Sequence, residues 1–313
     1  MSLRVAVVAH SDVAGGAESQ LVRLYEGLRD RHDVDVTLVG GVPGWPSALG
    51  RVVRVDAGPK LTRRQPLLAQ GRRAVDYLRR ARRTARRLDV DVYHVQYFRE
   101  KLVLPRPLSH RASVLWTEHG PLPEFPLGGI GLLRAQASHA SVVAVSAGVA
   151  ASLDAQRIAS RTIWNPLPPV STRDTRQPGE PVTVLYAGRL HAAKRVDLLL
   201  EAARAVPEVR VLIAGDGAER AALEATAPSN AVFVGHRADV AELIAAAEAL
   251  ELGGEVFAPT PSALAAALAA IAPGADRAPV PDRIAAERTT EAWVDAHHAL
   301  MVDLVLGRDG AGR

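Results

Sequence analysis

Short apolar runs alternate with amphipathic stretches along the first half of the chain, and the two patterns predict strands and helices. The runs that we expect to be strands are LRVAVVAH (3–10), VDVTLVG (34–40), VVRVD (52–56), DVYHVQ (91–96), SVLWTEH (113–119) and SVVAVS (141–146). Residues 21–30, 67–88 and 149–156 should form helices between them. Nearly continuous apolar strands that alternate with helices favour a parallel sheet covered on both faces.

The second half repeats this pattern with VTVLYAG (182–188), VRVLIAG (209–215) and AVFVG (231–235). Each run ends in a glycine, at Gly188, Gly215 and Gly235. In open α/β sheets, ligands bind at the carboxyl ends of the strands, where the following helices also present their N-termini. We therefore expect an α/β protein with two Rossmann-like, doubly wound parallel-sheet domains that face a cleft.

A proline-rich stretch separates the two halves. WNPLPPVSTRDTRQPGEP (164–181) holds five prolines among polar residues, and such a segment continues neither a helix nor a central strand. A chain of 313 residues also exceeds the usual size of one domain, about 100 to 200 residues. We predict a first domain over residues 1–165, a linker over 166–181 and a second domain over 182–285.

The composition restricts the chemistry and the location. The chain has no cysteine, which excludes disulfides, thiolate nucleophiles and cysteine-ligated metal centres. It has no run of about 18 uncharged apolar residues, and its opening MSLRVAVVAHSD lacks the long apolar core of a signal peptide. We therefore expect a cytoplasmic protein.

The net charge of +4 conceals opposite charges in the two halves, +10 over residues 1–170 and −6 over residues 171–313. On a helix over residues 67–88, one face is basic and the other apolar. The basic face holds Arg72, Arg73, Arg79, Arg80, Arg82, Arg83, Arg86 and Arg87, and the apolar face holds Ala74, Leu78, Ala81, Ala85 and Leu88. Two interpretations stay open, a solvated outer face and peripheral contact with anionic lipid at the inner membrane face. Binding to nucleic acid is not expected, because stacking aromatic residues do not alternate with the arginines.

Two cations, Arg189 and Lys194, lie between the glycine that ends the run 182–187 and the amphipathic helix that follows. Positive side chains at the start of a helix oppose the helix dipole unless an anion is bound there. Arginine offers a planar fork and lysine a mobile point charge, and both suit phosphate oxygens. The alternative is that both side chains are simply solvated.

Seven stretches of the chain occur in the order that is typical of one enzyme family. They are AHSDVAGGAES, WTEHG, VVAVS, IWNPLPP, YAGRLHAAKRVDLLLEA, VLIAGDGAERAAL and VFVGHRADVAELIAAA. On these motifs, residues 3 to about 247 resemble the family 4 (group 1) retaining glycosyltransferases of the GT-B fold. The resemblance implies transfer of a sugar from a nucleotide diphosphate-sugar to an acceptor with retention of anomeric configuration. It implies no cofactor besides that nucleotide-sugar co-substrate.

The resemblance also implies roles for single residues. Arg189 and Lys194 would contact the diphosphate of the donor and so hold the leaving group during catalysis. The loop at Gly15 and Gly16 would be a second anion-binding element, since glycine lets backbone N–H groups approach a phosphate closely. Without the resemblance, a glycine pair is more simply a tight turn.

Three histidines receive different interpretations. His119 would point toward the hydroxyl groups of the transferred sugar, although a histidine at a strand end is often only a structural, hydrogen-bonded residue. The backbone at Gly235 and His236 would approach the nucleotide base. His94 is expected to lie in packing or in the cleft wall.

No metal site is predicted. Asp33 with Asp35 and Asp89 with Asp91 form Asp-x-Asp pairs, but each pair precedes an apolar strand and is more typical of a polar turn. Cations of the protein can replace a metal ion at a diphosphate, so we expect chemistry without a metal.

The second domain departs from the family pattern. After ELIAAA (242–247) the family has a further strand, a glycine-containing loop and an E-x7-E segment that binds diphosphate and ribose, and this chain passes directly to EALELGGEVFAPTPSALAAALAA (248–270). We therefore expect a shortened second domain that lacks about one βαβ unit of roughly 30 residues. Three interpretations stay open: an active enzyme with a rebuilt donor pocket, an inactive GT-B scaffold that acts as a binding or membrane-associated protein, and a sequence from which a segment was lost.

The end of the chain predicts one more helix. Residues 286–306 include an apolar stripe of Trp293, Ala296, Leu300 and Leu304, and the resemblance implies that this helix packs back on the first domain. His297 and His298 are adjacent and should face different directions. Residues 307–313 are expected to be a disordered tail.

Overall fold

The structure is a computed structural model that describes residues 2–11, 15–55, 67–122, 129–166, 182–237, 243, 261–270 and 288–311. The chain divides into two compact units. Unit 1 comprises Met1–Pro166 together with Glu287–Arg313, and unit 2 comprises Leu167–Ala286. In the described part of the chain, no helix has the length and apolar character that crossing a membrane requires.

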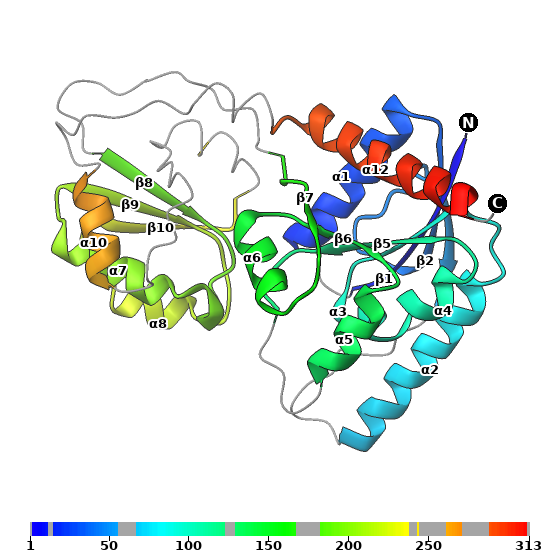
Figure 1. The fold of residues 1–313 in the computed structure, drawn as a ribbon. Helices are drawn as coiled ribbons and strands as arrows, with labels where there is room; N and C mark the ends of the chain where they lie inside the picture. The colour runs from blue at the N-terminus through cyan, green and yellow to red at the C-terminus, as the bar shows by residue number, and fades with distance from the viewer. Residues whose placement is uncertain are drawn as a thin grey trace. The chain divides into compact units, whose positions relative to one another are not determined.

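Unit 1 is built on a seven-stranded parallel sheet (Figure 1). Its strands are β1 (Leu3–His10), β2 (Val34–Gly41), β3 (Arg51–Arg54), β4 (Val92–Val95), β5 (Ser113–Glu118), β6 (Ser141–Ala144) and β7 (Arg161–Thr162), in the order β3-β2-β1-β4-β5-β6-β7. The six strands expected from the apolar runs are confirmed to within a few residues, and β7 is an addition. The order reverses between β1 and β4, and ligands of such sheets bind at the carboxyl ends beside that reversal.

Helices cover both faces of this sheet, as the nearly continuous apolar strands predicted. One face packs against α1 (Gly16–Arg31) and α12 (Thr290–Ala311). The other face packs against α2 (Leu67–Ala85), α5 (Gly129–Ala137) and α6 (Ala147–Ala155), with the short helices α3 (Phe98–Val103) and α4 (Pro105–Ser109) beside them.

Helix α12 packs on α1 in unit 1, but its buried stripe differs from the predicted one. Ala296 is exposed and Leu304 is only partly buried. The buried positions are Trp293, Val294, His297, Leu300, Met301 and Val305. Because the sheet and α1 together offer a wide surface, the helix buries two adjacent columns of side chains.

The expected disordered tail is corrected over residues 307–311, because α12 continues to Ala311, and residues 312–313 lie outside the described residues. The guanidinium of Arg308 donates a hydrogen bond to the backbone oxygen of Ser109 (2.6 Å). This contact anchors the last turns of the helix to the final residue of α4.

Helix α2 buries Tyr77, Ala81 and Ala85, which lie four residues apart along one face. Leu78 and Leu88 pack only partly against this core, and the side chain of Ala74 lies outside the described residues. The predicted apolar positions Ala81 and Ala85 are confirmed, and the prediction had left Tyr77 out. Tyr77 is buried because its hydroxyl donates a hydrogen bond to Oε1 of Glu100 (2.6 Å), a buried residue of α3.

Burial raises the pKa of Glu100, and this effect outweighs the hydrogen bond from Tyr77 and the charges of Arg99 and Lys101, which act in the opposite direction. A raised pKa in the folded state contributes stability that is present below the unfolded value of 4.5 and is lost as the pH rises through the folded value. We expect Glu100→Gln to raise the free energy of unfolding at neutral pH. The variant should also lack the decrease in stability that accompanies ionisation of Glu100 in the wild type. Urea unfolding of both proteins across the acid range measures it, and identical pH dependence would contradict the prediction.

Unit 2 contains a parallel three-stranded sheet in its described part, with β8 (Val182–Ala187), β9 (Val209–Ala214) and β10 (Ala231–Gly235) in the order β10-β9-β8. All three strands were predicted. Helices α7 (Val196–Ala205) and α8 (Arg220–Ala225) pack on it, and α10 (Pro261–Ala270) packs on α7 and on β8 and β9. The stretch 244–260, on which the expectation of a missing βαβ unit depends, lies outside the described residues.

Candidate functional site

The carboxyl ends of the three strands of unit 2 are joined by backbone hydrogen bonds. The amide of Gly188 donates to the oxygen of Ala214 (2.9 Å), and the amide of Gly215 donates to the oxygen of Gly235 (2.7 Å). One residue further on, the amide of Leu190 donates to the oxygen of Asp216 (2.9 Å). These bonds join the ends of the three strands into one edge, at the end where ligands of such sheets bind.

Gly215 is required by this arrangement. Its φ angle is +156°, and a Cβ atom at this position would lie 1.8 Å from the backbone oxygen of Gly188. A side chain there would force the loops after β8 and β9 apart. The glycine thus lets the backbone that carries Arg189 lie directly against the neighbouring loop.

Arg189 and Lys194 both belong to this edge, and both are exposed. Arg189 follows Gly188 directly, and Lys194 ends the short 3-10 helix η1 (Ala192–Lys194) before α7. Neither side chain forms an ion pair with any carboxylate of the described residues, in contrast to the adjacent Arg195, whose guanidinium pairs with Asp197 (2.9 Å). Of three neighbouring cations, the structure therefore leaves the two predicted ones available to an anion.

Gly235 and His236 lie at the end of β10. Gly235 has a φ angle of +72°, and its backbone oxygen accepts the hydrogen bond from Gly215. His236 is exposed. Gly235 therefore contacts the loop after β9, which lies between β10 and the loop that carries Arg189. The expected approach of Gly235 and His236 to a nucleotide base stays a prediction.

The loop at Gly15 and Gly16 begins α1 in unit 1, with Gly15 as the N-cap residue. The carboxylate of Glu18 already lies at this helix start, since a Cβ atom on Gly15 would be 2.8 Å from its Oε2. The hydroxyl of Tyr97 donates to Oε1 of Glu18 (3.0 Å). Gly15 therefore has a local reason to be a glycine, and any bound phosphate would lie beside a carboxylate.

Glu18 is ionised although it is only 9% exposed. Burial acts to raise its pKa, but hydrogen bonds from Ser11, its own backbone, Tyr97 and Gly15 together outweigh burial and lower the pKa. Donors that satisfy a buried carboxylate stabilise its charged form. Glu18 was not predicted to have a role, and its place in the first turn of α1 was the signal that could have found it.

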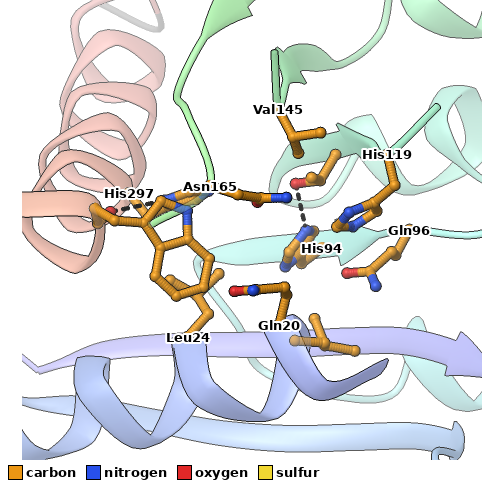
Figure 2. Close-up of a pocket in the computed structure, with 11 residues that line it drawn as sticks. Gln20, Leu24, His94, Gln96, His119, Val145, Asn165 and His297 are labelled. Atoms are coloured by element: carbon orange, nitrogen blue, oxygen red, sulfur yellow. Dashed lines mark hydrogen bonds between the residues drawn. The ribbon is translucent and has the colours of Figure 1, made fainter. Parts of the chain in front are cut away.

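A pocket opens at the carboxyl ends of β4 and β5 in unit 1, and His119 lies in its wall (Figure 2). Gln20 reaches into it from α1, Asn165 from the segment after β7, and His297 from α12. His94 is fully buried, and its ring nitrogens hydrogen-bond the hydroxyls of Tyr25 (2.8 Å) and Thr117 (2.9 Å). Gln96 also lines the pocket and donates to the backbone oxygen of Ala17 (3.0 Å), which connects the pocket to the start of α1.

The three histidines of the pocket are neutral at neutral pH. Burial lowers the pKa of His119 to about 4 and that of His297 to about 4, and it lowers the pKa of His94 well below the ordinary value. Nδ1 of His297 donates to the backbone oxygen of Trp293 (2.9 Å), so its Nε2 carries the lone pair. His119 thus suits hydrogen bonding to hydroxyl groups rather than pairing with a negative charge.

Asp89 and Asp91 lie before β4 and Asp33 lies before β2, whereas Asp35 lies within β2. Arg4 forms ion pairs with both Asp89 and Asp91, and Asp33 accepts a hydrogen bond from the hydroxyl of Ser2 (3.1 Å). Among the described residues, no group of three or more histidine, aspartate or glutamate side chains is placed to hold a metal ion.

Comparison with known proteins gives two family matches. Residues 14–169 match the model described as Glycosyltransferase Family 4, and residues 181–296 match the model described as Glycosyl transferases group 1. No curated protein matches the sequence.

Several solved structures share the fold. The Anabaena protein Alr3699/HepE in complex with UDP is 18% identical, with a TM-score of 0.56 over 78% of this chain and 72% of that one. AviGT4, a glycosyltransferase involved in avilamycin A biosynthesis, is 18% identical, with a TM-score of 0.54 over 97% of this chain and 98% of that one. The trehalose 6-phosphate synthase of Burkholderia multivorans is 11% identical, with a TM-score of 0.66 over 100% of this chain and 99% of that one.

Proposed function

The chain belongs to the family 4, group 1 glycosyltransferases of the GT-B fold, and on that premise we propose that it transfers a sugar from a nucleoside diphosphate-sugar to an acceptor with retention of configuration. The observation that carries this proposal is the exposed pair Arg189 and Lys194 on the edge formed by the loops after β8, β9 and β10. The solved complexes of the Anabaena protein with UDP and with UDP-glucose support a nucleotide-sugar as the donor.

The two cations act on the leaving group. When the bond between the sugar and the diphosphate breaks, negative charge develops on phosphate oxygens. Fixed positive charges that face those oxygens stabilise the transition state more than the ground state, which lowers the barrier. The guanidinium of Arg189 can hold two oxygens in one plane, and the ammonium of Lys194 can follow the third. In this proposal the protein supplies the positive charge that a metal ion would otherwise supply.

The retaining course is what the resemblance to the family implies, and in this proposal attack and departure share one face of the sugar. His119 hydrogen-bonds a hydroxyl of the transferred sugar, and its low pKa keeps it uncharged there. The acceptor hydroxyl attacks on the face from which the diphosphate departs, and a phosphate oxygen takes its proton. In this proposal the donor is also surrounded by backbone groups, which belong to Gly15, Gly16, Gly235 and His236.

A panel of nucleotides tests the donor site. Addition of UDP, GDP or ADP, alone and as the sugar conjugate, should raise the melting temperature for one base, because a ligand at about 100 times its Kd adds about 2.7 kcal/mol of stability. Thermal unfolding followed with a dye is the measurement. If no nucleotide stabilises the protein while the wild type is folded, the chain is a scaffold without donor binding and the proposal is wrong.

We propose that the basic surface of α2 contacts anionic lipid. Arg79, Arg80, Arg82, Arg83, Arg86 and Arg87 are all exposed, whereas the side chains of Arg72 and Arg73 lie outside the described residues. Each arginine near an anionic surface contributes up to about 1 kcal/mol. The cytoplasmic location stays a prediction, and this surface would bring such a protein to the inner face of the membrane.

Sedimentation with vesicles tests this contact. Binding to vesicles of phosphatidylcholine with phosphatidylglycerol is expected, with none to phosphatidylcholine alone. The variant Arg82→Gln/Arg83→Gln/Arg86→Gln should lose about 3 kcal/mol of that binding. Arg210→Gln, an exposed residue of β9, is the control and should bind as the wild type does. Equal binding of the triple variant and the wild type would show that the arginines are only a solvated face.

A further inference from the structure

Helix α12 carries two adjacent histidines, and each of them meets histidines of other elements of unit 1. The ring of His298 stacks on the ring of His32, the residue that caps the end of α1, with the ring centres 3.8 Å apart and the planes 4° apart. His297 lines the pocket of unit 1 together with His94 and His119 (Figure 2). Five histidines therefore meet where one turn of α12 packs on the rest of unit 1, and histidine is the side chain that ordinarily gains its charge between about pH 8 and pH 5.

The inner contact, made by His297, is unfavourable to positive charge. The pocket has room for about one water molecule, and no aspartate or glutamate side chain is among the described residues that line it. Burial is the main cause that lowers the pKa of His94, and the charges of His297, His119 and Lys101 act in the same direction. For His119, burial, Lys101 and His297 lower the pKa, and Glu18 alone raises it. A proton on one of these rings therefore opposes a proton on the others, and the contact closes only around neutral rings.

The outer contact, made by His298, opposes a second proton. Nε2 of His32 lies 2.8 Å from Oδ1 of Asp295, and the guanidinium of Arg31 pairs with the same carboxylate (2.8 Å) and also experiences the charge of Glu291. Burial is the main cause that lowers the pKa of His298, His32 and the amino terminus act in the same direction, and Asp295 acts in the opposite one. If both stacked rings carry a proton, two like charges lie 3.8 Å apart and repel each other. The outer contact therefore also weakens when its histidines become charged.

We propose that α12 is an acid-sensitive strap, which protonation of the histidines at its two contacts releases from α1 and from the pocket before the rest of unit 1 unfolds. Histidines whose pKa is lowered in the folded state contribute stability that is fully present above the unfolded value of 6.5. It is lost as the pH falls toward the folded values, which are about 4 for His119 and His297. Because α12 contributes no strand to the sheet, it can detach while the backbone bonds between the strands remain. Release would remove the wall of the pocket that faces His119, and only this consequence for sugar transfer rests on the proposed function.

Hydrogen exchange of the full chain, followed by mass spectrometry at about pH 7 and at about pH 5, tests the release. After correction for the intrinsic effect of pH on exchange, peptides of α12 (Thr290–Ala311) should exchange faster at the lower pH. The expected acceleration is about tenfold for each histidine whose pKa is one unit lower in the docked helix. Peptides of α5 (Gly129–Ala137), on the other face of the sheet, should keep their protection. Unchanged exchange of α12, or an equal acceleration of α12 and α5, would overturn the proposal.

Variants of the outer contact assign the effect to its residues. Both stacked rings are only partly buried, so His32→Gln/His298→Gln should fold, and it should lose about tenfold of the acid-induced acceleration of α12. His298→Gln alone is a milder variant and should change the acceleration in the same direction. His139→Gln, just after α5, is the matched control and should respond to acid as the wild type does. An acceleration that both outer variants keep in full, or that His139→Gln reduces equally, would refute the proposal, whereas failure of the nucleotide panel contradicts only the proposed function.

Discussion

Replacing Arg189 and Lys194 together by alanine is expected to lower sugar transfer by about 1,000-fold or more and to abolish stabilisation by nucleotides. The reason is that both cations would face the charge that develops on the leaving diphosphate, and removal of even one such preorganised donor costs about 100- to 1,000-fold in rate. Because both side chains are exposed and lie outside the cores of unit 2, the variant should fold as the wild type does. Initial rates with the nucleotide-sugar from the panel, and thermal shifts with the matching nucleotide, are the measurements.

Two controls separate a specific effect from a general loss of charge. Arg210→Gln removes an exposed positive charge from β9 and should leave transfer unchanged. Arg189→Lys keeps the charge but loses the planar fork, so its rate should lie between those of the wild type and the alanine variant. A double variant that transfers sugar at the wild-type rate would refute the proposed role of the two cations.

Replacing Lys101 by methionine is expected to destabilise unit 1 by about 3–5 kcal/mol, because it leaves a buried carboxylate without its partner. The side chain of Lys101 is 2% exposed and that of Glu118 is 13% exposed, and the ammonium donates to Oε2 of Glu118 (2.9 Å). The indole of Trp116 donates to the same oxygen (3.1 Å). The carboxylate therefore has a second donor, but no second charge balances it within this network.

Urea unfolding followed by tryptophan fluorescence measures this effect in unit 1, since Trp45, Trp116, Trp164 and Trp293 all lie there. The double variant Lys101→Met/Glu118→Gln should recover more than half of the loss, because glutamine is neutral and still accepts from Trp116. Equal stability of Lys101→Met and the wild type would show that the pair contributes nothing. Equal instability of the single and double variants would assign the loss to packing around the methionine.

The local features of the fold and of the candidate site in unit 2 could be read from the sequence. Apolar runs bounded by glycine and polar residues predict strands, since a strand buried on both faces needs apolar side chains along its whole length. The glycines after β8, β9 and β10 predicted where those strands end, and the structure joins the three loops. The positions of Arg189 and Lys194 followed from the same reasoning, because residues a few positions after a strand lie at its carboxyl end.

Contacts between residues far apart in the sequence could not be read in this way. Helical periodicity indicates that α12 has an apolar face, but not that Trp293 and His297 meet Gln20 of α1 and Asn165 at one pocket. Tyr77 joins the predicted Ala81 and Ala85 in the buried column of α2, where Glu100, 23 residues further on, offers an acceptor for its hydroxyl. The carboxylate of Glu18 at the helix start likewise depends on Tyr97, which lies 79 residues away.

The amino-acid sequence by itself determined the family, the α/β class, the ends of the strands and the positions of Arg189 and Lys194 after β8, since each depends on residue types and spacings within a short stretch. Only the tertiary structure decided that Arg195 is neutralised by Asp197 while Arg189 and Lys194 are not, and that the two histidines of α12 meet histidines of distant elements. The physical reason is that hydrogen bonds, ion pairs and burial depend on where a side chain lies in space, and packing brings distant segments of the chain together at those places.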